Sequence, residues 1–243
     1  MSTKKGQLKF KDIEGTITPF LPAGLFDVSN IDETTAKEIR RQLGVYKNIV
    51  FDECERNWSV YGTPKVETDG LVFDGASYVK TLSAIGGANP FTVECYAKAS
   101  VEHSASSYGP MSVCCYGDDN NVFSFIYNTS DHMAFNVKMG GNWKIQGVYT
   151  QKSPVNTFRH LAISYDGTKI YCFVDGELIH TATATVTSKA YHIFLGNGNT
   201  LLNGWKGTID EFRLSDVCRY TETFTPDAKF TKDANTISLL HFD

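Results

Sequence analysis

The sequence predicts an all-β protein, an antiparallel β-sandwich of the jelly-roll type that follows an N-terminal extended arm and one short helix. From about residue 48 onward, short apolar runs alternate with polar residues at a period of two, as strands require. Two Asp-Gly turns follow each other between such runs and indicate tight hairpins. Aromatic residues, which pack well on a pleated surface, make up 13% of the 243 residues. These patterns place the sandwich in residues 48–243.

Residues 1–47 are expected to form a separate N-terminal region that makes attachment or subunit contacts. Residues 1–30 have little periodicity and are interrupted by proline and glycine, so we expect an extended arm that lies on a surface. Residues 32–43 carry the best helical pattern. Thr35 and Glu38 have the spacing of a capping box, which satisfies two backbone donors at a helix start.

The strands of the sandwich are expected in a regular series with no long helix between them, as in a sandwich or jelly roll. The clearest signal lies at residues 158–182, where two Asp-Gly turns separate three apolar runs and predict a three-stranded meander. Residues 91–98 alternate strictly, which predicts a strand with two unlike faces. The other expected strands cover residues 49–51, 71–75, 78–79, 111–116, 121–127, 132–139, 143–149, 190–196, 207–214 and 238–242.

Charge and hydropathy argue against two classes of function. The formal net charge is −4, and the basic residues near the N-terminus are typical of a solvated tail, so we expect no nucleic-acid binding. No apolar run approaches the ~20 residues that cross a bilayer, so no membrane insertion is expected. The first residues lack the apolar core of a signal peptide, and we therefore expect synthesis and folding in a cytoplasm.

The six cysteines are expected to be reduced thiols, most of them buried. No pair has the CxxC spacing, and no histidine stands at the spacing of a zinc ligand. Cys114 and Cys115 are adjacent, which is unfavourable for a disulfide between them.

The sequence contains four strand motifs, at residues 91–98, 158–165, 171–176 and 207–215. They resemble strands of concanavalin A-like, laminin-G-like domains, in the order and at the spacing of that family. The first resembles the family's FTVEAWVK strand, and the next two resemble its WHHVALTY strand and its LYVDG hairpin. The last resembles its GxIDEVRIS strand. The resemblance extends over residues 48–243 and implies the fold, but this fold hosts many unrelated activities.

The end of the chain resembles a tail that is frequent in laminin-G-like domains of bacteriophage virion proteins. Residues 216–226 resemble its DVARYTxxFTP part, and residues 238–243 resemble its LLLHFD ending. The resemblance implies a virion protein that is made in the host cytoplasm and released by lysis.

The pattern of acidic residues argues against an enzyme. Glycoside hydrolases that share this fold carry two catalytic carboxylates in a Glu-x-Asp-x-x-Glu strand. The matching strand here has only Glu94, with Cys and Lys where further acids would stand, and the chain has no Gly-x-Ser-x-Gly elbow. We therefore expect no catalytic residues and no required cofactor.

A structural calcium ion is the one metal that the resemblance suggests. In related glucanases an aspartate of the late strand binds calcium, and Asp210 is the matching residue. Asp52 and Asp74, with nearby carbonyl groups, could complete an oxygen shell. The alternative is that Asp210 caps backbone donors at the edge of the sandwich.

A glycan site is expected in loops that combine an aromatic ring with amide and carboxylate groups, because sugars stack on rings and hydrogen-bond through hydroxyls. Trp143 beside Asn142 is the most lectin-like pair, whereas Trp205 stands where a large aromatic belongs to the core. Loops rich in Gly and Asn also serve as ordinary turns, which is the alternative. The candidate residues are Tyr108, Asp118, Asn120, Asn142, Trp143 and Asn197.

These observations lead to one functional hypothesis and two alternatives. We expect a non-enzymatic bacteriophage virion protein, in head decoration, collar or tail-associated adhesion, that contacts other virion subunits through residues 1–47 and forms a homo-oligomer in the particle. Its sandwich would bind host-surface glycans. The alternatives are a free carbohydrate-binding lectin and a divergent glycoside hydrolase or lyase.

Overall fold

The computed structural model of the chain divides into two compact units, Met1–Lys47 and Asn48–Asp243. Each unit is described by itself. The structure describes residues 9–11, 17–19, 53–54, 58–86, 90–102, 111–128, 130–185, 190–198 and 204–242.

In the first unit, the described residues form a short antiparallel pair. Strand β1 (Lys9–Lys11) pairs with β2 (Ile17–Pro19), with Phe10 opposite Thr18. The expected arm therefore contains two paired three-residue strands. The helix expected at residues 32–43 and the strand expected at 49–51 lie outside the described residues.

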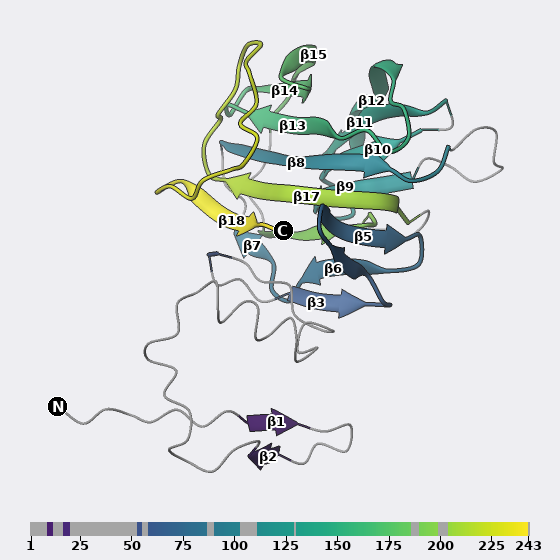
Figure 1. Cartoon of the computed structure of the whole chain (residues 1–243). Coiled ribbons are helices and arrows are strands. Elements are labelled where there is room, and N and C mark those ends of the chain that lie inside the picture. The colour runs from purple at the N-terminus through teal and green to yellow at the C-terminus, as the bar shows by residue number, and fades with distance from the viewer. Residues whose placement is uncertain are drawn as a thin grey trace. The chain divides into compact units, whose positions relative to one another are not determined.

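The second unit is a β-sandwich of two eight-stranded sheets, which we call sheet I and sheet II (Figure 1). Sheet I has the order β12-β11-β10-β9-β16-β6-β3, with β7 on β16. Its strands are β3 (Trp58–Tyr61), β6 (Tyr78–Thr81), β7 (Ile85–Gly86), β9 (Met111–Gly117), β10 (Val122–Tyr127), β11 (His132–Met139), β12 (Asn142–Lys152) and β16 (Ala190–Leu195).

Sheet II has the order β15-β14-β13-β8-β17-β5-β4, with β18 on β17. Its strands are β4 (Lys65–Glu67), β5 (Gly70–Asp74), β8 (Phe91–Ala99), β13 (Arg159–Tyr165), β14 (Lys169–Val174), β15 (Glu177–Thr183), β17 (Lys206–Ser215) and β18 (Thr236–Leu240). All pairings of these strands are antiparallel, and the described residues contain no helix, which confirms the all-β prediction. The described part of the chain accordingly offers no helix with the length and apolar character needed to span a bilayer.

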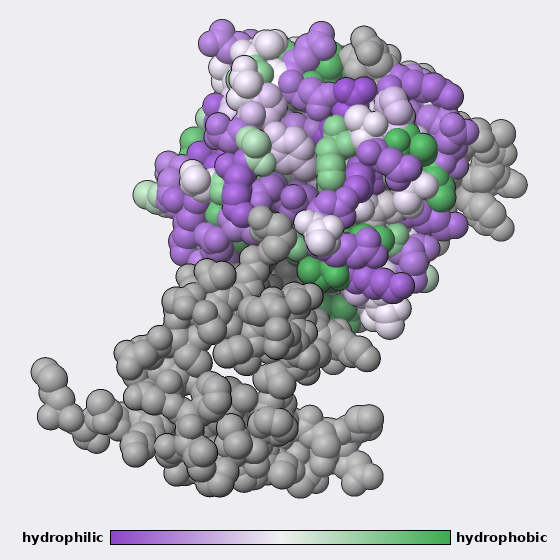
Figure 2. All heavy atoms as spheres, in the orientation of Figure 1, coloured by the Kyte–Doolittle hydropathy of each residue, from purple (hydrophilic) through white to green (hydrophobic). Residues whose placement is uncertain are grey.

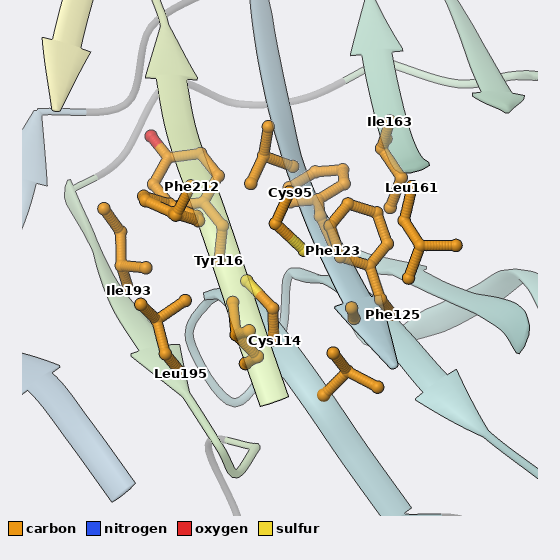
Figure 3. Close-up of a cluster of buried hydrophobic side chains, with 14 of the residues drawn as sticks. Cys95, Cys114, Tyr116, Phe123, Phe125, Leu161, Ile163, Ile193, Leu195 and Phe212 are labelled. Carbon is orange, nitrogen blue, oxygen red and sulfur yellow. The ribbon is translucent and has the colours of Figure 1, made fainter. Parts of the chain in front are cut away.

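The core lies between the sheets and is filled mainly by alternate residues of the longer strands (Figure 3). Phe91 of sheet II packs edge-on against Tyr116 and Phe123 of sheet I, at 5.4 and 4.7 Å between ring centroids. Trp205 is fully buried, as expected. All six cysteines are free, and four of them are buried. The side chains labelled in Figure 3 are Cys95, Cys114, Tyr116, Phe123, Phe125, Leu161, Ile163, Ile193, Leu195 and Phe212.

The predicted three-stranded meander is present as β13, β14 and β15. At its second turn, Asp175 and Gly176 both have positive φ, at 50° and 77°, as a two-residue hairpin requires. At its first turn the carboxylate of Asp166 accepts the N–H groups of Thr168 and Lys169, each at 2.7 Å. These hydrogen bonds lower the pKa of Asp166 to about 2, and the backbone hydrogen bond from Lys169 has the largest effect.

A buried bend in β17 ties the chain's last residues to the sandwich. Glu211 is 3% exposed and has a φ of 49°, where the register of β17 against β8 shifts. One carboxylate oxygen of Glu211 accepts the N–H of Phe230 at 2.6 Å. The other lies 2.5 Å from Nδ1 of His241, whose Nε2 lies 3.2 Å from Glu53. The carboxylates of Glu211 and Glu53 raise the pKa of His241.

This histidine should make stability depend on pH in the neutral range. Because the folded state raises the pKa of His241, its contribution is complete below the ordinary value of about 6.5 and is lost as pH rises through the folded value. We expect the free energy of unfolding to fall over this interval, and His241→Gln to flatten the decline. Urea unfolding at several pH values measures it, with His180→Gln as control. An unchanged decline in His241→Gln would contradict the assignment.

Candidate functional site

Two neighbouring turns of sheet I form a polar cluster at one end of its strands. The turn of residues 118–121 joins β9 to β10, and Gly140 and Gly141 join β11 to β12. Because these four strands are consecutive neighbours, the two turns lie at the same end of the sheet. The Gly141 N–H donates to the Asn120 carbonyl at 2.9 Å, and the Gly140 N–H donates to Oδ1 of Asn121 at 3.1 Å. We call residues 118–121, 138 and 140–143 the turn cluster.

Asp118 shapes the first of these turns. Its Oδ1 accepts the N–H groups of Asn120 and Asn121 at 2.8 and 2.7 Å, and also the side-chain amide of Asn121 at 3.3 Å. This pattern is an Asx turn, in which an aspartate oxygen satisfies backbone donors two and three residues ahead. The carboxylate therefore holds the exposed Asn120 in place.

Trp143 is the large exposed ring of the turn cluster, with 47% of its surface accessible. It stands opposite Lys138 in the register of β11 and β12, so both side chains lie on the outer face of sheet I. Nζ of Lys138 lies 5.8 Å from the indole centroid and donates to the carbonyl of Asp119 at 3.0 Å. Asn142 donates to the carbonyl of Gly140 at 3.2 Å. An aromatic face, a cation and side-chain amides thus lie together in solvent.

The structure brings together four of the six expected sugar-binding residues, Asp118, Asn120, Asn142 and Trp143. Asn197 lies elsewhere, because it follows the opposite end of β16 and pairs its own Oδ1 with the N–H of Gly198 at 2.8 Å. Its side chain is buried. Tyr108 lies outside the described residues.

Glu94, the acid considered for catalysis, lies on the outer face of sheet II and is completely buried. Oε1 accepts Nε of Arg213 at 2.8 Å, and Oε2 lies 3.1 Å both from Nε2 of His160 and from the hydroxyl of Tyr220. Burial would raise the pKa of Glu94, but the hydrogen bond from His160 and the charge of Arg213 outweigh it and lower the pKa. The carboxylate is ionised, fully bonded and closed to solvent.

The segment between β17 and β18 covers this carboxylate. Tyr220 stacks on Phe224 at 3.6 Å between ring centroids, and Phe230 packs over the guanidinium of Arg213 at 4.5 Å. Figure 1 shows the segment as the yellow-green loop that joins β17 to β18. The face shown in Figure 2, to which sheet II and this segment belong, is mostly hydrophilic and has only scattered apolar residues. The tail motif of residues 216–226 therefore helps to shield the buried carboxylate of Glu94 from solvent.

Residues 73–223 match the family model of the concanavalin A-like lectin/glucanases superfamily. The chain belongs to this superfamily. Its fold also resembles tailspike protein 2 of bacteriophage CBA120, with a TM-score of 0.54 and 14% identity over 76% of this chain and 33% of that one. No curated protein matches the sequence.

Two further solved structures have the same fold. Domain 4 of AbnA, an extracellular arabinanase of Geobacillus stearothermophilus solved with arabinotriose, is 18% identical over 65% of this chain and 81% of that chain, with a TM-score of 0.52. A Trypanosoma rangeli sialidase is 12% identical over 68% of this chain and 28% of that chain, with a TM-score of 0.51. At these identities the likeness shows the fold alone. The chain spans about a third or less of the sialidase and the tailspike.

The structure shows how the residues that were expected to bind calcium are placed. Asp74 stands opposite Lys206 in the pairing of β5 with β17, and Asp210 lies four residues further along β17. Four strand residues span about 13 Å, so the two carboxylates cannot share one ion. Oδ1 of Asp74 instead accepts the N–H groups of Ala76 and Ser77 at 2.9 and 2.8 Å. Asp52 lies outside the described residues, among which no group of three or more ligand side chains gathers.

Aromatic residues near the other edge of sheet I were not expected from the sequence. Tyr61 of β3 stacks on Tyr78 of β6, at 4.4 Å between ring centroids and 10° between ring planes. Tyr61 is 43% exposed. The signal was present in the alternation of β3, in which Trp58 points inward and Tyr61 outward. The alternation places Tyr61 on the outer face of the sheet, but it does not identify Tyr78 on another strand as the ring on which Tyr61 stacks.

The buried charge of Glu94 predicts a large effect of removing its partner. Arg213→Met leaves an ionised carboxylate without its cation, and we expect the free energy of unfolding to fall by about 3–5 kcal/mol. Arg159→Met, which removes an exposed ion pair with Asp175, should cost about 0–1 kcal/mol. Guanidinium unfolding at pH 7 measures both. The double variant Glu94→Leu, Arg213→Met should be more stable than Arg213→Met alone, and the opposite order would refute an unpaired charge as the cause.

Proposed function

We propose that this chain is a non-catalytic glycan-binding module that is carried by a bacteriophage particle. The observation that carries the proposal is the exposed indole of Trp143, which lies beside Lys138 and Asn142 on one end of sheet I. A ring with an accessible face suits the apolar side of a sugar, and neighbouring amides suit its hydroxyls. The lectin/glucanase fold of the chain agrees with such a ligand.

The surroundings of Glu94 support a role without catalysis. A catalytic acid or nucleophile must reach the reacting atoms of its substrate. Glu94 is closed to solvent, and both of its oxygens are occupied by Arg213, His160 and Tyr220. Such a carboxylate stabilises the sandwich and has no free position for a sugar. A hydrolase would therefore need acids elsewhere on the chain.

The proposed place on a particle rests on the tail motif of residues 216–226 and agrees with the fold shared with a phage tailspike. In this proposal residues 1–47 contact other virion subunits, several copies assemble, and the sandwich meets glycans of the host surface. A free lectin would have the same sugar site without the assembly role.

Trp143→Ala tests the glycan site. We expect wild-type chain to bind a subset of an array of bacterial surface glycans, and the variant to lose about tenfold or more in affinity because stacking on the indole is removed. Leu82→Ala, which trims another exposed apolar residue, should bind as wild type does. An array without any hit, or an equal profile for Trp143→Ala, would refute the site.

Particle association tests the second half of the proposal. We expect the tagged full chain, produced during infection of the source host, to sediment with purified virions in a density gradient. A variant without residues 1–47 should stay in the lysate, since the proposed contacts are missing. Mass spectrometry of the gradient fractions measures both, and a full chain found only among soluble proteins would count against a virion role.

A further inference from the structure

We infer that the outer face of sheet I binds an extended acidic polysaccharide at two separate places, the turn cluster around Trp143 and a second subsite formed by Tyr61, Tyr78 and Lys80. This inference rests on the proposed glycan binding at Trp143 and names its ligand class. It follows from a pair of stacked rings, two lysine–ring contacts and the distribution of charge between the sheets.

The stacked pair of Tyr61 and Tyr78 gives the second subsite an immobilised ring. The two rings are nearly parallel at 4.4 Å, so one face of Tyr61 is held by Tyr78. Because Tyr61 is 43% exposed, part of its surface stays open to a ligand. A ring held in this way loses little conformational freedom when a sugar stacks on it. Trp143 is the corresponding exposed ring of the turn cluster.

Each place also has a lysine beside an aromatic ring. Nζ of Lys80 lies 4.9 Å from the ring centroid of Phe194, and Nζ of Lys138 lies 5.8 Å from that of Trp143. Neither lysine forms an ion pair with a carboxylate of the described residues, in contrast to Lys98 and Lys152, which pair with aspartates. Both ammonium groups are therefore available to a carboxylate or phosphate of the ligand.

The strand register places both subsites on the same face. Lys80 stands opposite Phe194, which stands opposite Cys115, and the row continues through Ser124 to Asn136. Directly opposed residues of antiparallel strands point to the same side. Tyr78 and Lys138 lie two residues along from members of this row, so they share its side. Tyr61 and Trp143 are opposite Tyr78 and Lys138 and complete the face.

The charges of the two sheets are sharply different. No strand of sheet I contains Asp or Glu, whereas these strands carry Lys80, Lys138, Lys144 and Lys152. Acids lie in the turns next to these strands: Asp118 and Asp119 belong to the turn cluster, and the buried Asp131 pairs with Lys152. In a chain with a net charge of −4, the strands of this sheet thus carry positive charges only, and Lys80 and Lys138 are the two that lie beside aromatic rings. The strands of sheet II, in contrast, contain acids and bases in equal number. The acids are Glu67, Asp74, Glu94, Glu177, Asp210 and Glu211, and the bases are Lys65, Lys98, Arg159, Lys169, Lys206 and Arg213.

The separation of the subsites sets the length of the ligand. Trp143 and Tyr61 stand on the two ends of the strand order β12-β11-β10-β9-β16-β6-β3. Six steps of about 4.8 Å place them roughly 29 Å apart along the sheet. A disaccharide reaches one subsite only, whereas a polysaccharide reaches both and gains avidity from the second contact.

The experiment compares acidic polysaccharides with their neutral derivatives. Full-length protein is measured by biolayer interferometry against bacterial capsular polysaccharides that contain uronic acids, each in native and in carboxyl-reduced form. We expect at least tenfold tighter binding to a native form, and a decrease with rising salt because the lysines attract carboxylates. Lys80→Gln and Lys138→Gln should each weaken this binding about threefold to tenfold. Lys169→Gln, an exposed lysine at the start of β14 in sheet II, should not.

Chain length separates the two subsites. Tyr61→Ala should weaken binding of a long native polymer about tenfold and leave the affinity of the Trp143 end for the disaccharide unchanged, because a disaccharide bound at Trp143 does not reach Tyr61. Val66→Ala, which trims an exposed residue of sheet II, serves as the control, and equal melting temperatures show that the variants fold.

Each result decides a different claim. Equal binding of native and carboxyl-reduced polymers overturns the acidic class, and polymer binding that Tyr61→Ala and Lys80→Gln leave unchanged overturns the second subsite. In both cases, loss of binding in Trp143→Ala would leave the proposed glycan function intact. Binding to no polysaccharide would refute that function together with this inference.

Discussion

The charge of Glu94 is the constraint around which one half of the sandwich is organised. A carboxylate without solvent is tolerated only when hydrogen-bond donors and a cation surround it. Arg213 comes from a neighbouring strand on one side, His160 from the neighbouring strand on the other, and Tyr220 from the segment that closes over them. Three strands and the late part of the chain are thus fixed in one arrangement. The cost of an unpaired charge in any other arrangement favours this register over its neighbours.

This closure leaves the two outer faces of the sandwich with different properties. On sheet II, the segment between β17 and β18 packs on the outer face, where the rings of Phe224 and Phe230 lie against the ring of His160. On sheet I, acids are absent from the strands, and two lysines lie beside aromatic rings, the exposed Trp143 and the buried Phe194. One sheet therefore stabilises the domain, and the other is the surface on which we place a ligand.

Local signals in the sequence were sufficient for most strands, because the Asp-Gly turn at Asp175 and the alternation of β8 need only neighbouring residues. The nearness of the two turns around Trp143 also follows from four consecutive strands. The partners of Glu94 could not be found in this way. Arg213 is 119 residues away, and its alignment depends on a bulge in β17 that no short pattern specifies. The stacking of Tyr61 on Tyr78 likewise depends on register between strands.

The cysteines give the sandwich a further property. The thiolate is the form of cysteine that reacts, and burial raises the pKa of Cys95, Cys114 and Cys172 far above the ordinary value, so these side chains stay protonated and out of reach. Cys115 is also buried, which leaves Cys54 and Cys218 as the partly accessible thiols. The core is formed without a disulfide, so it has no disulfide that could be reduced. The folded shape therefore does not depend on a disulfide, and a reducing medium leaves the covalent structure of the domain unchanged.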